Sequence, residues 1–287
     1  MNTLSERLTE FYTGPMKGLM EQLEANGLKD RLQCPFLISL YRSGLKGEEE
    51  REKAKKADPS WYLKKETPEH EEWYTKADIK IMFFGQEPHR WKNDMDTDVG
   101  DLMAVYEDFL DDKYVVEGSS GYFSEDEIKN SRIFKFAING IMSCMRDDVL
   151  RPYPGKRVSM IWNNISKLST RDGKPVNMQA HEIERKYFHV IPEEVRILKP
   201  DILIFFTGPG QDRYYEYIKE NFTIAGEPLA LGNLPVHDVA KLPIKEATLA
   251  YKTYHPSATI SDERHWDNYR AILADIKENI DKLLKKE

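Results

Sequence analysis

The sequence predicts an α/β protein, a three-layer α/β/α sandwich with a central, mainly parallel four-stranded sheet. Four short apolar runs have the length and composition of buried strands, and stretches with helical periodicity separate them. The runs are residues 79–84, 158–162, 201–206 and 248–254. Strands that alternate with helices form parallel sheets with both faces covered. Because the runs extend over most of the chain, we expect residues 1–287 to form a single domain.

Helices are predicted from apolar spacing and capping residues. Apolar side chains repeat at helical spacing from Leu4 to Leu23, Asn26-Gly27 is a stop signal, and Gly14-Pro15 is expected to break or kink this run. We interpret residues 1–76 as an N-terminal helical extension that ends in a surface connection with short helical pieces. Further helices are expected at residues 129–146, 180–198 and 211–221, and from Ser261 toward the C-terminus.

The composition excludes several classes of protein. Hydrophobic residues make up 40% of the 287 residues, which is enough for a core and argues against a disordered chain. No apolar run reaches the roughly 18 residues of a membrane helix, and the N-terminus has no apolar signal segment, so we expect no membrane association. Two cysteines cannot build a disulfide framework or a four-thiolate site, which favours a reduced, cytoplasmic protein. We expect neither a metal nor another cofactor.

Polar loops follow all four predicted strands, at the edge of the sheet where parallel α/β proteins bind ligands. Glu87 is held on a rigid turn by Pro88 and is a candidate for orienting or activating a water molecule. The alternative is a loop acid that caps a helix or pairs with Arg90. Thr207-Gly208 opens the loop after the third strand, where a structural turn is the simpler interpretation.

The loops after the second and fourth strands hold two further candidates. The amide of Asn163 can donate and accept hydrogen bonds, as a reader of a base edge must, although an Asn also commonly ends a strand and starts a turn. His255 precedes Pro256 and Ser257, and a neutral imidazole there can donate to a developing oxyanion. The alternative is that His255 only forms hydrogen bonds with the backbone at the turn into the last helix.

The order and strand-end placement of these motifs resemble the uracil-DNA glycosylase superfamily. Its best-known family has a strand that ends in a GQDPY loop, a later apolar strand that ends in Asn, and a final strand that ends in HPSP. The corresponding segments here are FFGQEPH at residues 83–89, MIWNNISKL at 160–168 and YHPSA at 254–258. The architectural resemblance covers residues 77–270.

The resemblance implies an enzyme that flips a base out of DNA and hydrolyses the bond between base and sugar. Glu87 falls on the water-activating Asp of the family, and His255 falls on the residue that stabilises the departing base. Asn163 falls on the residue that contacts the uracil edge. The predicted substrate-binding residues are Gly85, Gln86, His89, Asn163 and Ser257. The implied partner is single- or double-stranded DNA that carries uracil or another deaminated base.

Three residues differ from the family motifs. Glu87 is one methylene longer than Asp, His89 replaces the Tyr that excludes the thymine methyl, and Ala258 replaces the second Pro of HPSP. Two alternatives therefore stay open beside the glycosylase. One is a catalytically inactive member that binds nucleic acid or a protein, and the other is an enzyme that acts on a free nucleoside or nucleotide.

Charge is distributed unevenly along the chain. The formal net charge is −7, but the predicted acidic insertion at residues 94–127 holds twelve acids and one Lys, a net −11, so the other residues carry +4. The insertion is a solvated surface, a lid that excludes or mimics nucleic acid, or a binding site for a protein partner. Seven cations near the second strand are predicted to form a phosphate-facing rim, unless they are scattered surface cations. They are Arg146, Arg151, Lys156, Arg157, Lys167, Arg171 and Lys174.

One further motif is incomplete. His181-Glu182 opens a pattern similar to the HExxH helix of zinc proteases, but Arg185 stands where the second histidine ligand is required.

Overall fold

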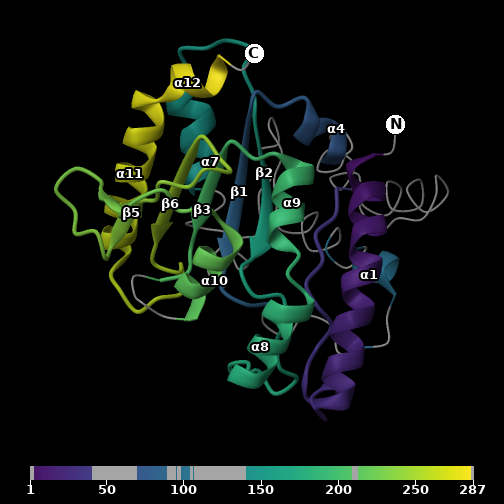
Figure 1. Ribbon diagram of the computed structural model, residues 1–287. Helices are drawn as coiled ribbons and strands as arrows, with labels where there is room; N and C mark the ends of the chain where they lie inside the picture. The colour runs from purple at the N-terminus through teal and green to yellow at the C-terminus, as the bar shows by residue number, and fades with distance from the viewer. Residues whose placement is uncertain are drawn as a thin grey trace, which may run out of the picture.

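A computed structural model describes residues 3–40, 70–88, 95, 98–103, 106, 140–208 and 213–285. These residues form an α/β fold around a six-stranded mixed sheet (Figure 1). The strands are β1 (Ile79–Gly85), β2 (Val158–Asn164), β3 (Ile202–Phe205), β4 (Leu229–Ala230), β5 (Val239–Lys241) and β6 (Leu249–Thr253). The helices are α1 (Leu4–Ala25), η1 (Lys29–Arg31), α4 (His70–Thr75), α7 (Ile141–Cys144), η3 (Met145–Val149), α8 (Met178–Tyr187), α9 (Ile191–Leu198), α10 (Arg213–Asn221), α11 (Asp262–Glu278) and α12 (Ile280–Leu284).

The sheet has the strand order β2-β1-β3-β6-β5-β4. The first four of these are parallel neighbours and correspond to the four predicted strands, which confirms the α/β class and the parallel core. The predicted count of four strands is wrong, because β5 and β4 extend the sheet in antiparallel pairing. These two strands have only three and two residues, too short for alternation of polar and apolar residues to appear in the sequence.

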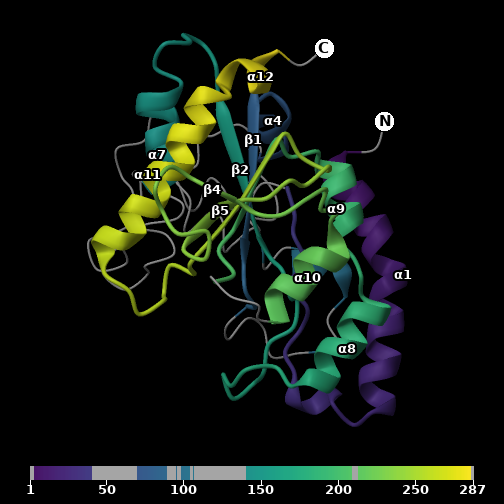
Figure 2. The same ribbon diagram turned by 60° about the vertical axis from the view of Figure 1, so that its left-hand side comes forward.

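Helices lie on both sides of the sheet. In two views, α7 and α11 lie on one side, while α1, α8 and α9 lie on the other (Figures 1 and 2). The four parallel strands between them are almost completely buried, as expected for a parallel sheet covered on both faces. None of the described helices combines the length and apolar composition that a membrane crossing requires.

The first helix is longer than the sequence predicts. Helix α1 runs through Pro15 as one continuous helix, so a break at Gly14-Pro15 is wrong, and a kink there stays a prediction. Its buried stripe, which includes Tyr12 and Leu19, packs against α8 and α9, and this tertiary contact outweighs the local cost of the proline. The helix stop at Asn26-Gly27 is confirmed, since Asn26 is the C-cap and Gly27 has φ +65°.

The helix predicted at residues 180–198 is two helices. Buried Phe188 and Val190 separate α8 from α9, and Pro192 lies in the first turn of α9, where its missing N–H costs nothing. The start of the last helix is confirmed, with Ser261 Oγ accepting from Arg264 N at 3.2 Å, but Asn279 divides the predicted helix into α11 and α12. Of the helix predicted at 129–146, residues 140–149 form a short helical segment that includes η3, and the remainder lies outside the described residues.

Two other predicted features fall largely outside the described residues. His89 is one, and the acidic insertion 94–127 is the other, apart from residues 95, 98–103 and 106. Residues 41–69, which hold most of the predicted surface connection, are also outside them.

Candidate active site at the carboxyl ends of the parallel strands

The loops after β1 and β2 are joined by backbone hydrogen bonds. Ile165 N donates to Gly85 O at 3.0 Å, and Ser166 N donates to Gln86 O at 3.0 Å. These bonds continue the parallel register, in which Gly85 faces Asn164, beyond the ends of the strands. The Gln86 backbone is therefore fixed at the carboxyl edge of the sheet.

The same edge continues to the loops after β3 and β6. The Gln86 side-chain amide donates to Thr207 O at 3.2 Å, and Gly208 N donates to Thr253 O at 3.1 Å. His255 follows Thr253 by two residues. The loops after β1, β2 and β3 are thus joined by hydrogen bonds along the carboxyl edge, and the third of them reaches the last residue of β6.

Gly85 is required by close packing at the end of β1. A Cβ added to it would lie 2.5 Å from Asn164 Oδ1 and 2.7 Å from Trp162 Cζ2, both far inside van der Waals contact. The absent side chain lets the first strand and the second approach each other where their loops begin. This packing explains the glycine without reference to a ligand, and its predicted role in substrate binding stays a prediction.

Glu87 lies at this edge with its side chain 18% exposed, and buried Pro88 follows it. Its Oε2 is 3.8 Å from Nε2 of His181, a residue of α8 whose side chain is only 1% exposed. The predicted water-activating carboxylate therefore has both access to solvent and a buried imidazole behind it.

His181 belongs to a buried polar chain that the sequence did not reveal. Its Nδ1 is 2.7 Å from the hydroxyl of Tyr217, and that hydroxyl donates to Glu184 Oε2 at 2.9 Å. Ser166 Oγ, from the loop after β2, donates to the same carboxylate oxygen at 2.7 Å. Burial raises the pKa of Tyr217, and the nearby Glu184 carboxylate raises it further, so the phenol stays protonated and donates. A His and a Glu spaced by three residues on the buried face of a helix were the available signal.

His255 has the chemical state expected of a neutral donor. Burial lowers its pKa to about 4, and nearby His265 acts in the same direction, so the ring is neutral near pH 7. Nδ1 accepts a hydrogen bond from Ser257 N at 3.2 Å. The proton of the neutral ring is therefore on Nε2. Ser257 itself is exposed, and the structure gives its backbone N–H a role in setting this tautomer.

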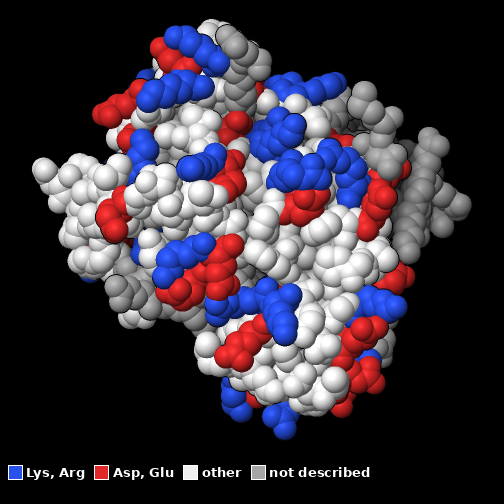
Figure 3. All heavy atoms as spheres, viewed as in Figure 1, with Lys and Arg blue, Asp and Glu red and all other residues white. Residues whose placement is uncertain are grey.

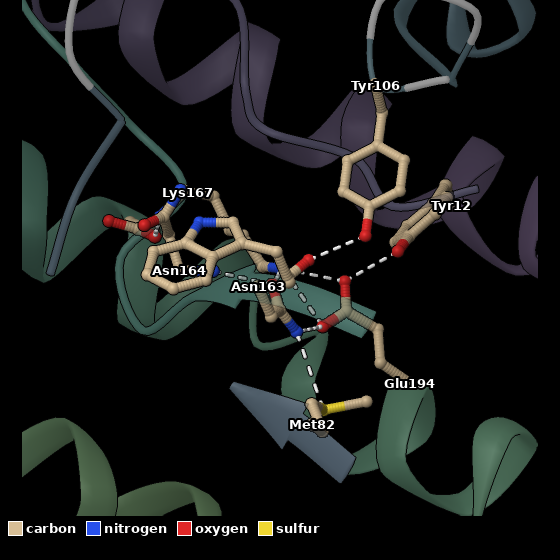
Figure 4. A network of polar contacts seen from close by, with 9 residues as sticks. Tyr12, Met82, Tyr106, Asn163, Asn164, Lys167 and Glu194 are labelled. Atoms are coloured by element: carbon tan, nitrogen blue, oxygen red, sulfur yellow. Dashed lines mark hydrogen bonds and ion pairs between the residues drawn. The ribbon is translucent and has the colours of Figure 1, made fainter. Parts of the chain in front are cut away.

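The side chain of Asn163 lies in a buried cluster (Figure 4). It is 0% exposed, and its Nδ2 donates to Glu194 Oε2 at 2.8 Å. Its Oδ1 accepts from Lys167 Nζ and from Asn164 N. Both ends of the amide that the sequence assigns to a base edge are thus occupied by the protein, whereas Asn164 Oδ1 lies against Gly85 at the strand end.

The centre of this cluster is a buried ion pair. Lys167 Nζ lies 2.8 and 2.9 Å from the two carboxylate oxygens of Glu194, and the two side chains are 1% and 0% exposed. Tyr12 of α1 donates to Glu194 Oε1 at 2.5 Å, and Figure 4 shows Tyr12 and Tyr106 approaching from the side of α1. Burial lowers the pKa of Lys167, and the attraction of Glu194 opposes this effect. The cluster joins α1, α9 and the end of β2.

The predicted phosphate-facing rim does not assemble at this edge. Lys167 is buried, and Arg146, Arg151, Lys156 and Arg157 precede β2, so a seven-residue strand of about 20 Å separates them from the carboxyl ends. Three rim cations are also paired with acids. Arg146 pairs with Asp147 and Lys156 with Asp78, both at 2.8 Å, and Lys174 pairs with Asp172 at 2.9 Å.

Charges on the face shown in Figure 3 are mixed. Blue and red side chains lie next to one another there, with broad uncharged areas between them (Figure 3). The ion pairs on α8, α9 and α10 explain this pattern, and they are Arg185–Glu220, Arg196–Glu193 and Lys219–Glu216. This face offers no single basic stripe for a DNA backbone.

Comparisons with known proteins assign neither a family nor a function to this site. No protein-family model matches the chain, and no curated protein matches it significantly. Within the described ranges, no three His, Cys, Asp or Glu side chains are grouped as a metal site requires.

Proposed function

We propose that the chain is a DNA glycosylase of the uracil-DNA glycosylase superfamily with its three-layer α/β/α fold. It would hydrolyse the N-glycosidic bond of uracil or a related deaminated base. The observation that carries this proposal is the joined set of strand-end loops, with Glu87 and a neutral His255 on the same edge of the sheet. The order of the three sequence motifs supports it.

The two candidate catalytic groups have suitable chemistry for this reaction. The departing base leaves as an anion, and a neutral imidazole with its proton on Nε2 forms a stronger hydrogen bond to that anion than to the bound base. The sugar becomes cationic, so an anionic Glu87 both stabilises it and accepts a proton from the attacking water.

Recognition of the base needs a different amide from the one the sequence assigns. Asn163 already uses both ends of its amide inside the buried cluster, so in this proposal it supports the end of β2. Asn164 and Gln86 then face the base. Asn164→Ala is expected to lower kcat/KM with little loss of stability, whereas Asn163→Ala is expected to destabilise the fold. A loss of kcat/KM in Asn163→Ala and a loss of stability in Asn164→Ala would instead assign Asn163 to the edge of the base.

The distribution of surface charge does not favour binding to the DNA backbone. Three cations of α8, α9 and α10, namely Arg185, Arg196 and Lys219, are paired with acids, so we expect a shallow dependence of DNA affinity on salt. Replacing the acids of residues 94–127 by Asn and Gln is expected to strengthen DNA binding, and unchanged binding would separate this segment from the DNA.

The proposal is tested by measuring free base released from single- and double-stranded oligonucleotides that contain uracil or hypoxanthine. Glu87→Gln and His255→Ala are each expected to lower the rate at least about tenfold. The matched controls are Glu182→Gln and His189→Ala, which change exposed residues of the α8 segment and are expected to leave the rate unchanged. Release that is equally fast in all four variants would refute the assigned site.

Two observations favour a second candidate, a catalytically inactive protein that binds a partner through the same edge. The buried amide of Asn163 and the paired surface cations are both unfavourable for reading a base in DNA. Fluorescence anisotropy with DNA and RNA across a range of salt concentrations distinguishes the two. Binding without base release supports the inactive nucleic-acid-binding protein, and the absence of both supports a protein partner.

A further inference from the structure

A buried histidine that the proposed reaction does not use lies behind Glu87. His181 is 1% exposed, and its Nε2 is 3.8 Å from Oε2 of Glu87. This Nε2 makes no hydrogen bond with any residue that the structure describes. A buried ring nitrogen without a hydrogen bond is costly, so its orientation toward the carboxylate requires an explanation.

The other ring nitrogen fixes the tautomer. Tyr217 has one hydroxyl proton, and the Glu184 carboxylate at 2.9 Å is a stronger acceptor for it than a neutral ring nitrogen. The Tyr217 oxygen then accepts from Nδ1 of His181 at 2.7 Å. In neutral His181 the proton is therefore on Nδ1, and Nε2 presents a lone pair to Glu87.

Among the residues that the structure describes, the charged and titratable groups around His181 come from four segments. Glu87 faces Nε2 from the loop after β1, and Glu184 lies 3.8 Å from Nδ1 on α8 itself. From α10, Tyr217 contacts Nδ1. The guanidinium of Arg185, a residue of α8, lies over the Tyr217 ring at 5.7 Å and pairs with Glu220 of α10. From the loop after β2, Ser166 Oγ and Lys167 N both donate to Glu184. The Glu184 carboxylate is thus held in place to stabilise positive charge on the imidazole.

We propose that His181 is a positioning residue that receives the proton which Glu87 removes from the attacking water, an inference that rests on the proposed function. As the water oxygen forms a bond to C1′ of the sugar, its O–H bond breaks and the proton passes to Glu87. It then passes to Nε2 when the 3.8 Å separation of Oε2 and Nε2 shortens to hydrogen-bond distance. The bond from C1′ to the base breaks, and its electron pair leaves with the base. The imidazolium is stabilised by the restored Glu87 carboxylate and, through Tyr217, by Glu184. The proton then returns to the base or to solvent.

The pH profile of base release tests this role. His181→Asn keeps an amide that can donate to Tyr217 but cannot accept a proton. We expect its maximal kcat to fall at least about tenfold, and the acid limb of its profile to move toward the ordinary range of a glutamate, about 4.3. Tyr217→Phe is expected to lower kcat in the same direction. The matched control is His189→Asn, which changes an exposed histidine just after α8 and should keep the wild-type profile.

A second readout does not depend on activity. In ¹⁵N spectra of histidine-labelled protein at neutral pH, we expect Nδ1 of His181 to carry the proton and the Nε2 signal to change in Glu87→Gln. If no substrate releases a base but these spectra behave as expected, the proposed function fails while the pairing of Glu87 and His181 stands. A proton found on Nε2, an Nε2 signal unaffected by Glu87→Gln, or a His181→Asn profile of wild-type shape would overturn the proposal.

Discussion

The buried pair of Lys167 and Glu194 is expected to dominate the stability of the site. Lys167→Met removes the cation and leaves the Glu194 carboxylate, which is 0% exposed, without its charge partner. Removing one member of a buried pair typically costs about 3–5 kcal/mol. The lost hydrogen bond to Asn163 Oδ1 belongs to the same cluster and favours the upper part of that range.

The assay is urea unfolding at neutral pH, supported by thermal unfolding. For a large domain each kcal/mol corresponds to about 2–4 °C, so the melting temperature should fall by roughly 6–20 °C. A double-mutant cycle with Glu194→Gln isolates the charge, because the double variant has no uncompensated carboxylate. We expect the double variant to be more stable than Lys167→Met alone.

The control is Lys174→Met, which removes a cation whose partner Asp172 is exposed. Its unfolding midpoint should equal that of the wild type, since exposed pairs contribute little. If Lys167→Met stays within about 1 kcal/mol of wild type, or if the cycle is additive, the buried pair does not have the importance that its burial and distances indicate.

Two other predictions follow from the strand ends. Gly85→Ala should destabilise the protein by about 1–3 kcal/mol in urea unfolding, because the new Cβ would lie 2.5 Å from Asn164 Oδ1 and 2.7 Å from Trp162 Cζ2. Gly14→Ala, where no atom lies within 4 Å of the new Cβ, should instead stabilise α1, and equal effects of the two changes would refute this packing argument. Because burial lowers the pKa of His255 from 6.5 to about 4, the unfolded chain binds a proton in this range that the folded chain does not. Stability should therefore fall as the pH decreases from 6.5 to 4, with a shallower fall in His255→Gln, and parallel curves for the two proteins would contradict the lowered pKa.

The four parallel strands could be predicted from the sequence because they are buried on both faces of the sheet. Such strands appear as continuous apolar runs, and the loops after them follow directly from the rule for parallel sheets. The two antiparallel strands left no comparable signal, since Leu229 and Ala230 of β4 are exposed. The continuation of α1 through Pro15 could not be predicted, because it depends on the packing of the helix against other elements and not on local helix propensity.

At the candidate site, the sequence does not predict which side chains contact one another. The sequence places Asn163 at the end of a strand, but it does not reveal that Glu194, 31 residues away, accepts from its amide. In the same way Lys167 looks like a surface cation until its 1% exposure is known. In the sequence, His181 stands out only as part of an incomplete zinc motif, whereas its importance in the structure comes from its contact with Glu87, on a different segment.

Single-turnover release of uracil from a uracil-containing oligonucleotide tests the central claim most directly. The wild-type protein is expected to release free uracil, and Glu87→Gln and His255→Ala are each expected to do so at least about tenfold more slowly. No release by the wild-type protein from single- or double-stranded substrate, or release at the same rate in both variants, would contradict the account.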